Sequence, residues 1–460
     1  MAEAETTAND SEATIGLDDA LVYEVHRALE NDERDLAAAL TFALHAADLA
    51  DLFELLQPQE RLELVRILNE GELDPTFLTY LDEGVREDII NEIGPSATGE
   101  ALAELDEDDA IEVLEDLDED AQREILKTLP LPERTLLEQG LAFPPETAGR
   151  LMQRDFVAVP EYWTVGQTID YLRASPDLPD DFYDLYIIDP RFRVVGSIAL
   201  SLVIRNRRNI LLSDLTIREL RTVGAMTVQE EVGYLFSQYG LSSAPVVDDD
   251  GMLLGVITFD DVVDVIQEEA EDDILKLGGV GERDVFATAV ETVQRRLPWL
   301  AVNLLTAIAA SLVIAQFDGA IEAIVALAVL MPIVASMGGN AGTQALTIAV
   351  RSLAVKELTT ANAGRQLIKE FAVGAANGLA FFIIGIVIAL VWFGDVGLAM
   401  VFGAAMIITL VVAGVAGIAI PFLLDRLGLD PAVSSTVFLT TVTDVVGFFA
   451  FLGLAALFLF

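Results

Sequence analysis

An aspartate inside an apolar segment is the first candidate for chemistry in this sequence. Asp444 lies in "STVFLTTVTDVVGFFAFLGLAALFLF", which contains no basic residue that could pair with it. A carboxylate near the centre of a bilayer costs several kcal/mol, so an intramembrane acid is a functional candidate by default. Thr440 stands one helical turn earlier on the same face. Because oxygen ligands without nitrogen or sulfur suit a hard cation, we expect Asp444 and Thr440 to bind one.

A second candidate is the polar stretch "PIVASMGGNAGTQALTIAV", which lies in another apolar segment. Irregular backbone at membrane depth survives only inside protein or beside a wet cavity. We therefore predict a helix break at Gly338 and Gly339 and a pore-lining role for Asn340. Close packing between helices is the alternative role for the glycines. It does not account for Asn340, Thr343 and Gln344, whose side chains need water, an ion or a neighbouring helix.

Five apolar segments follow residue 297, each long enough to cross a bilayer at roughly 20 residues per crossing. They cover about 298–317, 321–350, 371–393, 397–424 and 432–459. Basic residues precede the first segment and separate the second from the third and the fourth from the fifth. Since Lys and Arg mark the cytoplasmic side, we expect these connections and the N-terminal half in the cytosol and the C-terminus outside. This assignment leaves Asp444 as the only acid deep within a span.

Composition divides the chain into a strongly acidic part and a nearly uncharged part. Of its 74 acidic and 27 basic residues, 66 and 22 precede residue 298. Nucleic acid is excluded as a partner because its phosphates would be repelled, whereas divalent cations are natural partners. Dispersed acids with few lysines also fit a halophilic, acidic proteome, in which carboxylates keep a surface hydrated. The chain has no cysteine, which excludes disulfides, thiolate metal sites and cysteine nucleophiles.

Residues 20–150 have the pattern of short amphipathic helices with a loose internal repeat. Apolar residues recur three and four positions apart in "ALHAADLADLFELLQPQERLELVRIL" and again in "ALAELDEDDAIEVLEDLDEDAQREILKTL". Such units stack into a superhelical scaffold. His45 is expected to cap or pack a helix. A metal site would need a second imidazole nearby, and the only other histidine, His26, belongs to an earlier helix. Residues 1–19 read as an acidic disordered tail without the features of a signal peptide.

Residues 151–267 alternate between strands and helices, and the pattern occurs twice. "YIIDPRFRVVGSI" and "PVVDDDGMLLGVI" are both β-rich runs around a polar turn. This arrangement resembles a tandem pair of CBS domains, α/β modules that often bind adenine nucleotides. The resemblance implies phosphate and ribose contacts at Thr258 and Asp261 in "GVITFDD", where the first module has Ala199 and Leu202. ATP binding at the second module and packing without a nucleotide both stay open.

Taken together, these features resemble the MgtE-type magnesium channels over nearly the whole chain. Four motifs occur in the right order, namely "LHAADLADLFELL", "TFDDVVDVIQEEAEDDILKLGG", "PIVASMGGNAGTQALTIAVRSLA" and "PFLLDRLGLDPAVSSTVFLTTVTDVVG". The resemblance implies a multidomain fold with an all-α superhelical N-domain and an α/β tandem CBS pair. A connecting (plug) helix at 268–297 and an α-helical five-span transmembrane domain at 298–460 complete it. The expected protein is a multi-pass homodimer of the cell membrane.

The resemblance also implies where the pore lies and which residues line it. The pore would run between the protomers along the two-fold axis, and the family's selectivity aspartate falls on Asp444. A hydrated Mg²⁺ ion is usually held through one or two carboxylates with several waters kept, which fits two facing aspartates. Where family members often have "SNP", this chain has Ser435, Thr436 and Val437. Thr436 therefore offers a hydroxyl in place of an amide at the mouth of the pore.

The family closes its pore when cytosolic Mg²⁺ is high, because ions bridge acidic faces among the N-domain, the CBS pair and the connecting helix. The junction acids that match the family's ligands are Asp261, Asp264, Glu269, Asp272 and Asp273. Without ions these like charges repel, and ions that prefer the closed arrangement must shift the population toward it. A solvated surface role stays open for each of these acids.

We predict a Mg²⁺-selective channel or transporter for uptake, not an enzyme. A broader carrier of Co²⁺ or Mn²⁺ stays open, although no soft ligand lines the candidate pathway. A zinc hydrolase within the membrane would need a pair of histidines, and none lies in that part of the chain. An aspartyl hydrolase would need two facing carboxylates. A nucleotide-sensing scaffold held by inert helices would leave Asp444 and the polar stretch without a role.

Overall fold

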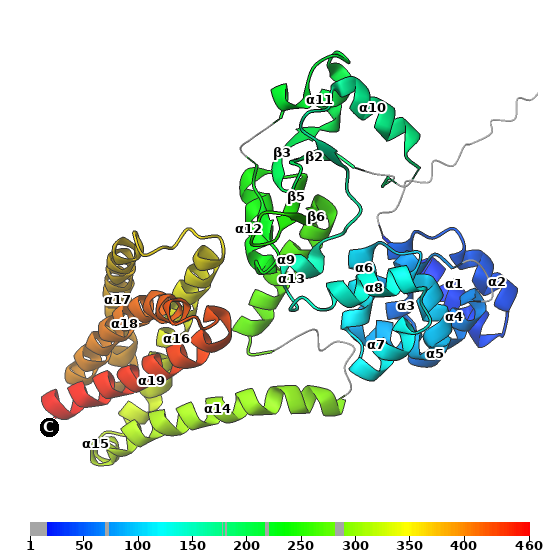
Figure 1. The fold of residues 1–460 in the computed structure, drawn as a ribbon. Coiled ribbons are helices and arrows are strands. Elements are labelled where there is room, and N and C mark those ends of the chain that lie inside the picture. The colour runs from blue at the N-terminus through cyan, green and yellow to red at the C-terminus, as the bar shows by residue number, and fades with distance from the viewer. Residues whose placement is uncertain (1–15, 70–72, 177, 180–181, 217–219, 281–288) are drawn as a thin grey trace, which may run out of the picture. The chain divides into compact units, whose positions relative to one another are not determined.

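The computed structural model describes residues 16–69, 73–176, 178–179, 182–216, 220–280 and 289–460. The chain divides into two compact units, residues 1–266 and residues 267–460, and each has its own core. Figure 1 gives the labels of the helices and strands.

The first part of the first unit is helical throughout the residues that the structure describes up to residue 151, as predicted. Acidic side chains begin several of its helices: Asp18, Asp82 and Asp118 each accept a hydrogen bond from a backbone amide of the first turn. His45 caps a helix as expected, because its Nδ1 accepts from the Ala47 amide at 3.2 Å. The elements are α1 (Asp19–Glu30), α2 (Arg34–Thr41), α3 (Ala46–Leu55), α4 (Pro58–Asn69), η1 (Pro75–Leu78), α5 (Glu83–Leu102), α6 (Glu107–Glu115), α7 (Glu119–Leu126), α8 (Leu131–Gly140) and α9 (Ala148–Leu151).

Two small sheets of identical topology follow, which confirms the predicted repeat of α/β modules. In each, the first strand pairs in parallel with the second, and the second pairs antiparallel with the third. The sheets meet at a hydrogen bond of 2.6 Å between the Tyr186 hydroxyl and Ser243 Oγ. The first module contains β1 (Ala158–Pro160), α10 (Val165–Ala174), β2 (Asp184–Ile188), β3 (Val194–Ala199), α11 (Leu200–Arg205) and η2 (Leu212–Asp214). The second contains β4 (Val223–Gly224), α12 (Gln229–Tyr239), β5 (Ser243–Val247) and β6 (Leu253–Thr258) and leads into α13 (Phe259–Leu277).

The border between the helical domain and the α/β modules differs slightly from the prediction at residue 150. Ala148 and Met152 are buried in the core of the second module, beside Val223 and Phe236. The Gly149 amide donates to the Ala225 carbonyl at 2.8 Å, so this short helix is hydrogen-bonded to the second module. α9 therefore packs with a module that begins some seventy residues later in the chain, a relation that local pattern does not reveal.

The second unit contains five helices long and apolar enough to cross a membrane, which confirms the predicted number of spans. They are α14 (Ala289–Ala315), α16 (Ala326–Ala354), α17 (Ala363–Phe393), α18 (Val396–Arg426) and α19 (Pro431–Phe458), and the short α15 (Asp318–Ala323) lies between the first two. α18 packs against α16, α17 and α19, and α14 packs against α19 (Figure 1). α17 begins at Ala363, earlier than the predicted residue 371, and this extension brings Glu370 into the helix.

The predicted connecting helix at 268–297 is not one element in the structure. Its first part is the end of α13, which starts at Phe259 in the second module, and its last part, from Ala289, is the beginning of α14. The intervening residues 281–288 lie outside the described residues. α13 ends in a turn at Gly279, whose φ of +68° favours glycine, and a Cβ there would lie 1.7 Å from the Trp299 indole nitrogen.

Candidate functional site

Asp444 lies in the continuous helix α19, and its carboxyl is half-buried. The start of the helix is fixed by Asp430, whose side chain accepts a hydrogen bond from the Ala432 amide at 2.7 Å, and by Pro431 in the first turn. Within the described residues, the Asp444 carboxyl makes no hydrogen bond and no ion pair. A single chain therefore leaves this acid free to accept an external partner.

The threonines near Asp444 direct their hydroxyl hydrogens to their own helix. Thr440 Oγ1 donates to the Thr436 carbonyl at 2.8 Å, and Thr443 Oγ1 donates to the Thr440 carbonyl at 3.0 Å. The acceptor lone pairs of these hydroxyls remain available. Thr440 is exposed in the single chain and shares a face with Asp444, whereas Thr443 is buried. Carboxylate and hydroxyl oxygens thus lie together on one face of α19, as hard cations prefer.

Thr436, predicted at the mouth of the pore, contacts the end of α13. Its hydroxyl donates to the Leu277 carbonyl at 3.1 Å, and Leu277 packs in a cluster with Ala432 and Leu439. The last residues of the helix that carries the junction acids are therefore bonded to the first turns of the helix that carries Asp444.

The predicted helix break at Gly338 and Gly339 is wrong, because α16 runs unbroken through both. A Cβ at Gly338 would lie 2.6 Å from Thr409 Cγ2, and one at Gly342 would lie 2.9 Å from Leu439 Cδ1. α18 therefore packs closely against α16 at Gly338, and α19 does so at Gly342. Close helix packing, the alternative given above, is the role of these two glycines. A Cβ at Gly339 would meet nothing within 4 Å. Asn340 is exposed in the single chain and has no hydrogen bond within the described residues.

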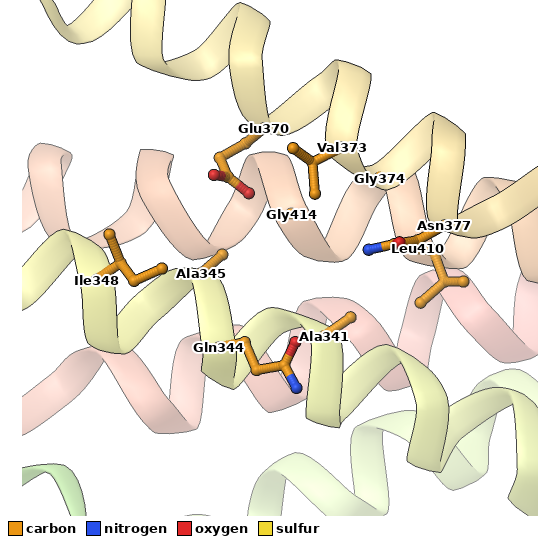
Figure 2. Close-up of a pocket in the computed structure, with 10 residues that line it drawn as sticks. All are labelled: Ala341, Gln344, Ala345, Ile348, Glu370, Val373, Gly374, Asn377, Leu410 and Gly414. Atoms are coloured by element: carbon orange, nitrogen blue, oxygen red, sulfur yellow. The ribbon is translucent and has the colours of Figure 1, made fainter.

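Glu370 is a second acid within a span, which corrects the view of Asp444 as the only one. Its side chain on α17 is 8% exposed and lines a cavity of about 130 Å³ between α16, α17 and α18. Figure 2 shows Glu370 directed from α17 toward α16 and α18, with Gln344 on the facing helix. The residues lining this cavity do not include Asp444. The two acids therefore do not share one site, as an aspartyl hydrolase would require.

In the first unit, acids of α6 face acids at the start of α13. Burial raises the pKa of Asp109 to about 7, with Glu112 and Asp261 adding to the rise. Burial also holds the pKa of Asp108 well above its usual range, and Asp261 is the strongest of the charges that add to it. Like charges drawn out of water favour the protonated forms. This interface between the helical domain and the second module is therefore electrostatically unfavourable when all its acids are ionised.

Asp261 is placed by a local hydrogen bond at the first turn of α13. Thr258 Oγ1 donates to Asp261 Oδ2 at 2.7 Å, and the Thr258 amide lies 3.4 Å from the same oxygen. Burial raises the pKa of Asp261 to about 6, against the lowering effect of the Thr258 hydrogen bond. Asp264, on the next turn, also has a raised pKa through burial and then through Asp260. The two residues predicted to contact a nucleotide are thus bonded to each other.

Basic side chains hold α6 in place around these acids. Arg154 Nη1 pairs with Glu107 Oε1 at 2.6 Å and joins the helical domain to the first residues of the modules. Arg86 of α5 donates to Asp116 Oδ2 at 2.7 Å and to Glu112 Oε1 at 2.9 Å. These pairs neutralise neighbouring acids but leave Asp108 and Asp109 without a cation partner in the residues that the structure describes.

In the second unit, the end of α13 meets the first turn of α19. Lys276 Nζ lies 3.4 Å from Asp272 Oδ2 and 3.3 Å from Asp430 Oδ2. Burial raises the pKa of Asp273, and Asp430 is the next cause. Glu269 lies one turn earlier on α13 and raises the pKa of Asp273 by a smaller amount. Asp430 thus joins Asp272 and Asp273 in one acidic group, with Lys276 as its internal cation.

Sequence reasoning missed three of these acids. Asp108 and Asp109 stand in "LDEDDA", where more acids begin a helix than capping requires, and this excess was the available signal. Asp430 looked like an ordinary helix cap before a proline. Across the described residues, no group of three or more histidines, aspartates or glutamates is placed to hold one metal ion. The acids instead face one another in smaller sets, with Asp108 and Asp109 near Asp261 and with Asp273 near Asp430.

Three family models match the chain in the order of its domains. The model described as "MgtE intracellular N domain" matches residues 44–146, "CBS domain" matches residues 212–268, and "Divalent cation transporter", the MgtE model, matches residues 331–454. The strands of the first module are outside the matched CBS range, although they repeat the topology of the second module.

Proteins named magnesium transporter MgtE are similar over almost the full length. The protein from Enterococcus faecalis is 32% identical over 432 residues, which cover 94% of this chain and 95% of that one. The protein from Thermus thermophilus is 32% identical over 450 residues, covering 93% and 99%. The soluble part of a magnesium transporter is 27% identical with a TM-score of 0.46, covering 55% of this chain and 98% of that structure. The cytosolic domain of the Mg²⁺ channel MgtE in complex with ATP is 26% identical with a TM-score of 0.48, covering 53% and 99%.

Proposed function

The chain belongs to the MgtE family of magnesium transporters, and from this premise we propose that it carries Mg²⁺ across the cell membrane along a path lined by Asp444. The observation that supports the path is the half-buried Asp444 carboxyl, which has no partner within the described residues. An unpaired acid at that depth is costly unless an ion or proton reaches it. Thr440 and Asn340, both exposed in the single chain, would line the same path.

The proposed assembly is a homodimer with its pore on the two-fold axis. Two Asp444 carboxylates would then face one another. Mg²⁺ keeps several waters and is usually bound by one or two carboxylates, so such a pair could select the hydrated ion and still release it. Carboxylate and hydroxyl oxygens suit Mn²⁺ as well as Mg²⁺, so preference for Mg²⁺ would depend on its reluctance to give up its waters, and no soft ligand lines the path to favour Co²⁺. The soluble domains would be cytosolic and the C-terminus outside.

Mg²⁺ is also proposed to close the path by binding at the acidic interfaces. One interface is that of α6 with Asp261 and Asp264, and the other is that of Asp272 and Asp273 with Asp430. Burial first, and then neighbouring acids, raise the pKa of Asp108, Asp109 and Asp273, and a divalent cation would offset both effects as a proton does. Glu269, the remaining expected ligand, lies on the same helix. The hydrogen bond from Thr436 to the Leu277 carbonyl offers a mechanical link from α13 to α19.

ATP at the second module is a further part of the proposal. Thr258 and Asp261 are at the expected positions, and a nucleotide would have to exchange their mutual hydrogen bond for its own contacts. Because Asp261 also faces Asp108, a nucleotide that engages it would alter the charge of the same interface. Nucleotide and Mg²⁺ binding would then be coupled, each changing the affinity for the other by the same factor.

The test is Mg²⁺ flux into liposomes by the purified protein, with Ca²⁺ as a competitor. Asp444→Asn is expected to lower flux at least about tenfold or to abolish the preference for Mg²⁺, because it removes the only charge on that face of α19. Asp318→Asn is the matched control, since it makes the same change at an exposed helix start outside the spans. Unchanged flux and selectivity in Asp444→Asn would refute the path. No flux in the wild type would favour an anchored nucleotide-sensing scaffold.

A further inference from the structure

A polar cavity at the surface of the membrane unit, with Gln344 and Asn377 exposed in the single chain and Glu370 buried, is not part of the proposed Asp444 path. Glu370 and Asn377 of α17 and Gln344 of α16 line it, together with Gly374 and Gly414. Figure 2 shows Glu370 and Asn377 on α17 and Gln344 on the facing α16, with Gly414 of α18 between the two helices. The cavity of about 130 Å³ is large enough for an ion and a few waters, each of which occupies about 30 Å³ in the liquid.

Glu370 is the group that makes this cavity unusual. Its side chain is more than nine-tenths buried and, within the described residues, makes no hydrogen bond and no ion pair. A Cβ at Gly414 would lie 3.7 Å from Glu370 Oε2, so the absence of a side chain on α18 keeps space free beside the carboxylate. No Lys or Arg is among the described residues that line the cavity. A buried carboxylate without a cation or hydrogen-bond donor is strongly disfavoured.

The amides of Gln344 and Asn377 show what kind of partner fits. Each presents a carbonyl oxygen as well as an NH₂ group, so an amide can turn its oxygen toward a cation. A carboxylate and two amide oxygens, supplemented by water, form a ligand set of hard oxygen donors. The two amides come from different helices, and α16 makes little direct contact with α17. A cation here would therefore bridge two helices that otherwise pack mainly through α18.

The charge of the cation follows from the single carboxylate. A monovalent ion makes the site neutral, whereas a divalent ion leaves one uncompensated positive charge in a low-dielectric region. A neighbouring cavity of about 280 Å³ shares Ile348 with the first and is lined by Arg365 and Lys369, as well as by Glu357. If ions enter there, the repulsion by these two cations is twice as large for a divalent ion. Both considerations favour a monovalent ion.

We propose that Glu370, Gln344 and Asn377 bind a monovalent alkali cation, one per chain, with Na⁺ as the probe. The site is separate from the Mg²⁺ path and does not depend on it. The bound ion would bridge α17 and α16, and α16 is the helix that carries Asn340. Monovalent cations would then influence the transport domain without being its cargo.

The experiment measures binding of radiolabelled Na⁺ to the full-length protein in detergent, in EDTA and at constant ionic strength set with choline chloride. We expect saturable binding that unlabelled Na⁺ or K⁺ displaces and choline does not. Glu370→Gln should abolish it. Glu322→Gln is the matched control because it removes an exposed acid of the same unit. Asp444→Asn should retain binding, which separates this site from the proposed path.

Three results would overturn the assignment. They are no saturable Na⁺ binding in the wild type, full binding in Glu370→Gln, and displacement by Mg²⁺ at concentrations well below those of Na⁺. The last would make the cavity a divalent site. If Glu370→Gln does not fold, Asn377→Leu carries the test, since it keeps the carboxylate and removes one oxygen ligand. Its affinity for Na⁺ should fall about tenfold, and an unchanged affinity would count against the site.

Discussion

At the scale of single residues, Asp109 shows how burial acts on an acid whose neighbours are also acids. Its pKa is raised to about 7, first by burial and then by Glu112 and Asp261. The folded chain therefore binds protons in this region at a pH where the unfolded chain, with an aspartate pKa of about 3.9, has lost them. The stability of the interface must depend on pH and on any cation that replaces the proton.

The sign of this dependence is a prediction for the chain in EDTA. Because the pKa of Asp109 is raised in the folded state, this residue stabilises the fold fully below about pH 4. That stabilisation is lost as the pH rises through about 7. Asp261, with a pKa of about 6, acts in the same direction. Hydrogen-exchange protection of α6 and α13, corrected for the intrinsic rate, should fall between pH 5.5 and 8. Asp109→Asn should flatten this profile and stabilise the region at pH 8 by on the order of 1–3 kcal/mol. Protection that increases with pH would contradict the prediction.

At the scale of elements, the contact between α17 and α18 depends on glycines that bring the two backbones together. A Cβ at Gly378 would lie 2.8 Å from the Ile407 Cα and 3.3 Å from its carbonyl oxygen. Backbone atoms cannot move aside as a flexible side chain can. The helices are therefore held at a separation that only glycine permits at this point, as is common between membrane helices.

Gly378→Ala is expected to destabilise the membrane unit by about 1–3 kcal/mol, because the helices must separate. Gly339→Ala is the matched control, since a Cβ there would meet nothing within 4 Å. It should be neutral or stabilising by about 0.5–1 kcal/mol, the gain of alanine over glycine within a helix. Thermal unfolding of the two variants in the same detergent measures the difference. Equal effects of both substitutions would argue against close packing as the role of Gly378.

At the scale of the whole molecule, the formal net charge of −47 opposes compaction. Two explanations of this charge make different predictions. If the acids only hydrate the surface, any salt screens them according to ionic strength. If facing acids bind Mg²⁺, a low concentration of that ion should make the protein more compact than screening of charges at the same ionic strength can.

We expect the hydrodynamic radius in 0.1 M NaCl with EDTA to exceed that in a few millimolar MgCl₂, while added NaCl of equal ionic strength has little effect. Sedimentation velocity measures the difference. Asp273→Asn together with Asp261→Asn should raise the Mg²⁺ concentration required, because one acid of each proposed interface is removed. If NaCl and MgCl₂ act equally at equal ionic strength, the acids form a solvated surface and the proposed clamp is refuted.

Much of the architecture was predictable because it depends on local pattern. Five spans follow from hydropathy, the repeated modules from alternating β-rich runs, and the cap at His45 from the preference of helix ends for side-chain acceptors. The same kind of pattern singled out Asp444, since an acid in an apolar run is conspicuous whatever surrounds it. None of these inferences requires knowledge of which surfaces meet.

What only the tertiary structure decided concerns contacts between distant segments. Gly338 and Gly339 suggested a break, but the helix continues through both, and Gly338 and Gly342 let α18 and α19 pack closely against it. Glu370 fell just outside a span drawn from hydropathy, and its burial depends on the packing of α17 against α18. The pairing of Asp261 with Asp108 and of Asp273 with Asp430 likewise depends on which helix faces which. The sequence alone determines how each segment divides its polar and apolar faces, but an acid's charge state and partners depend on what packs against it.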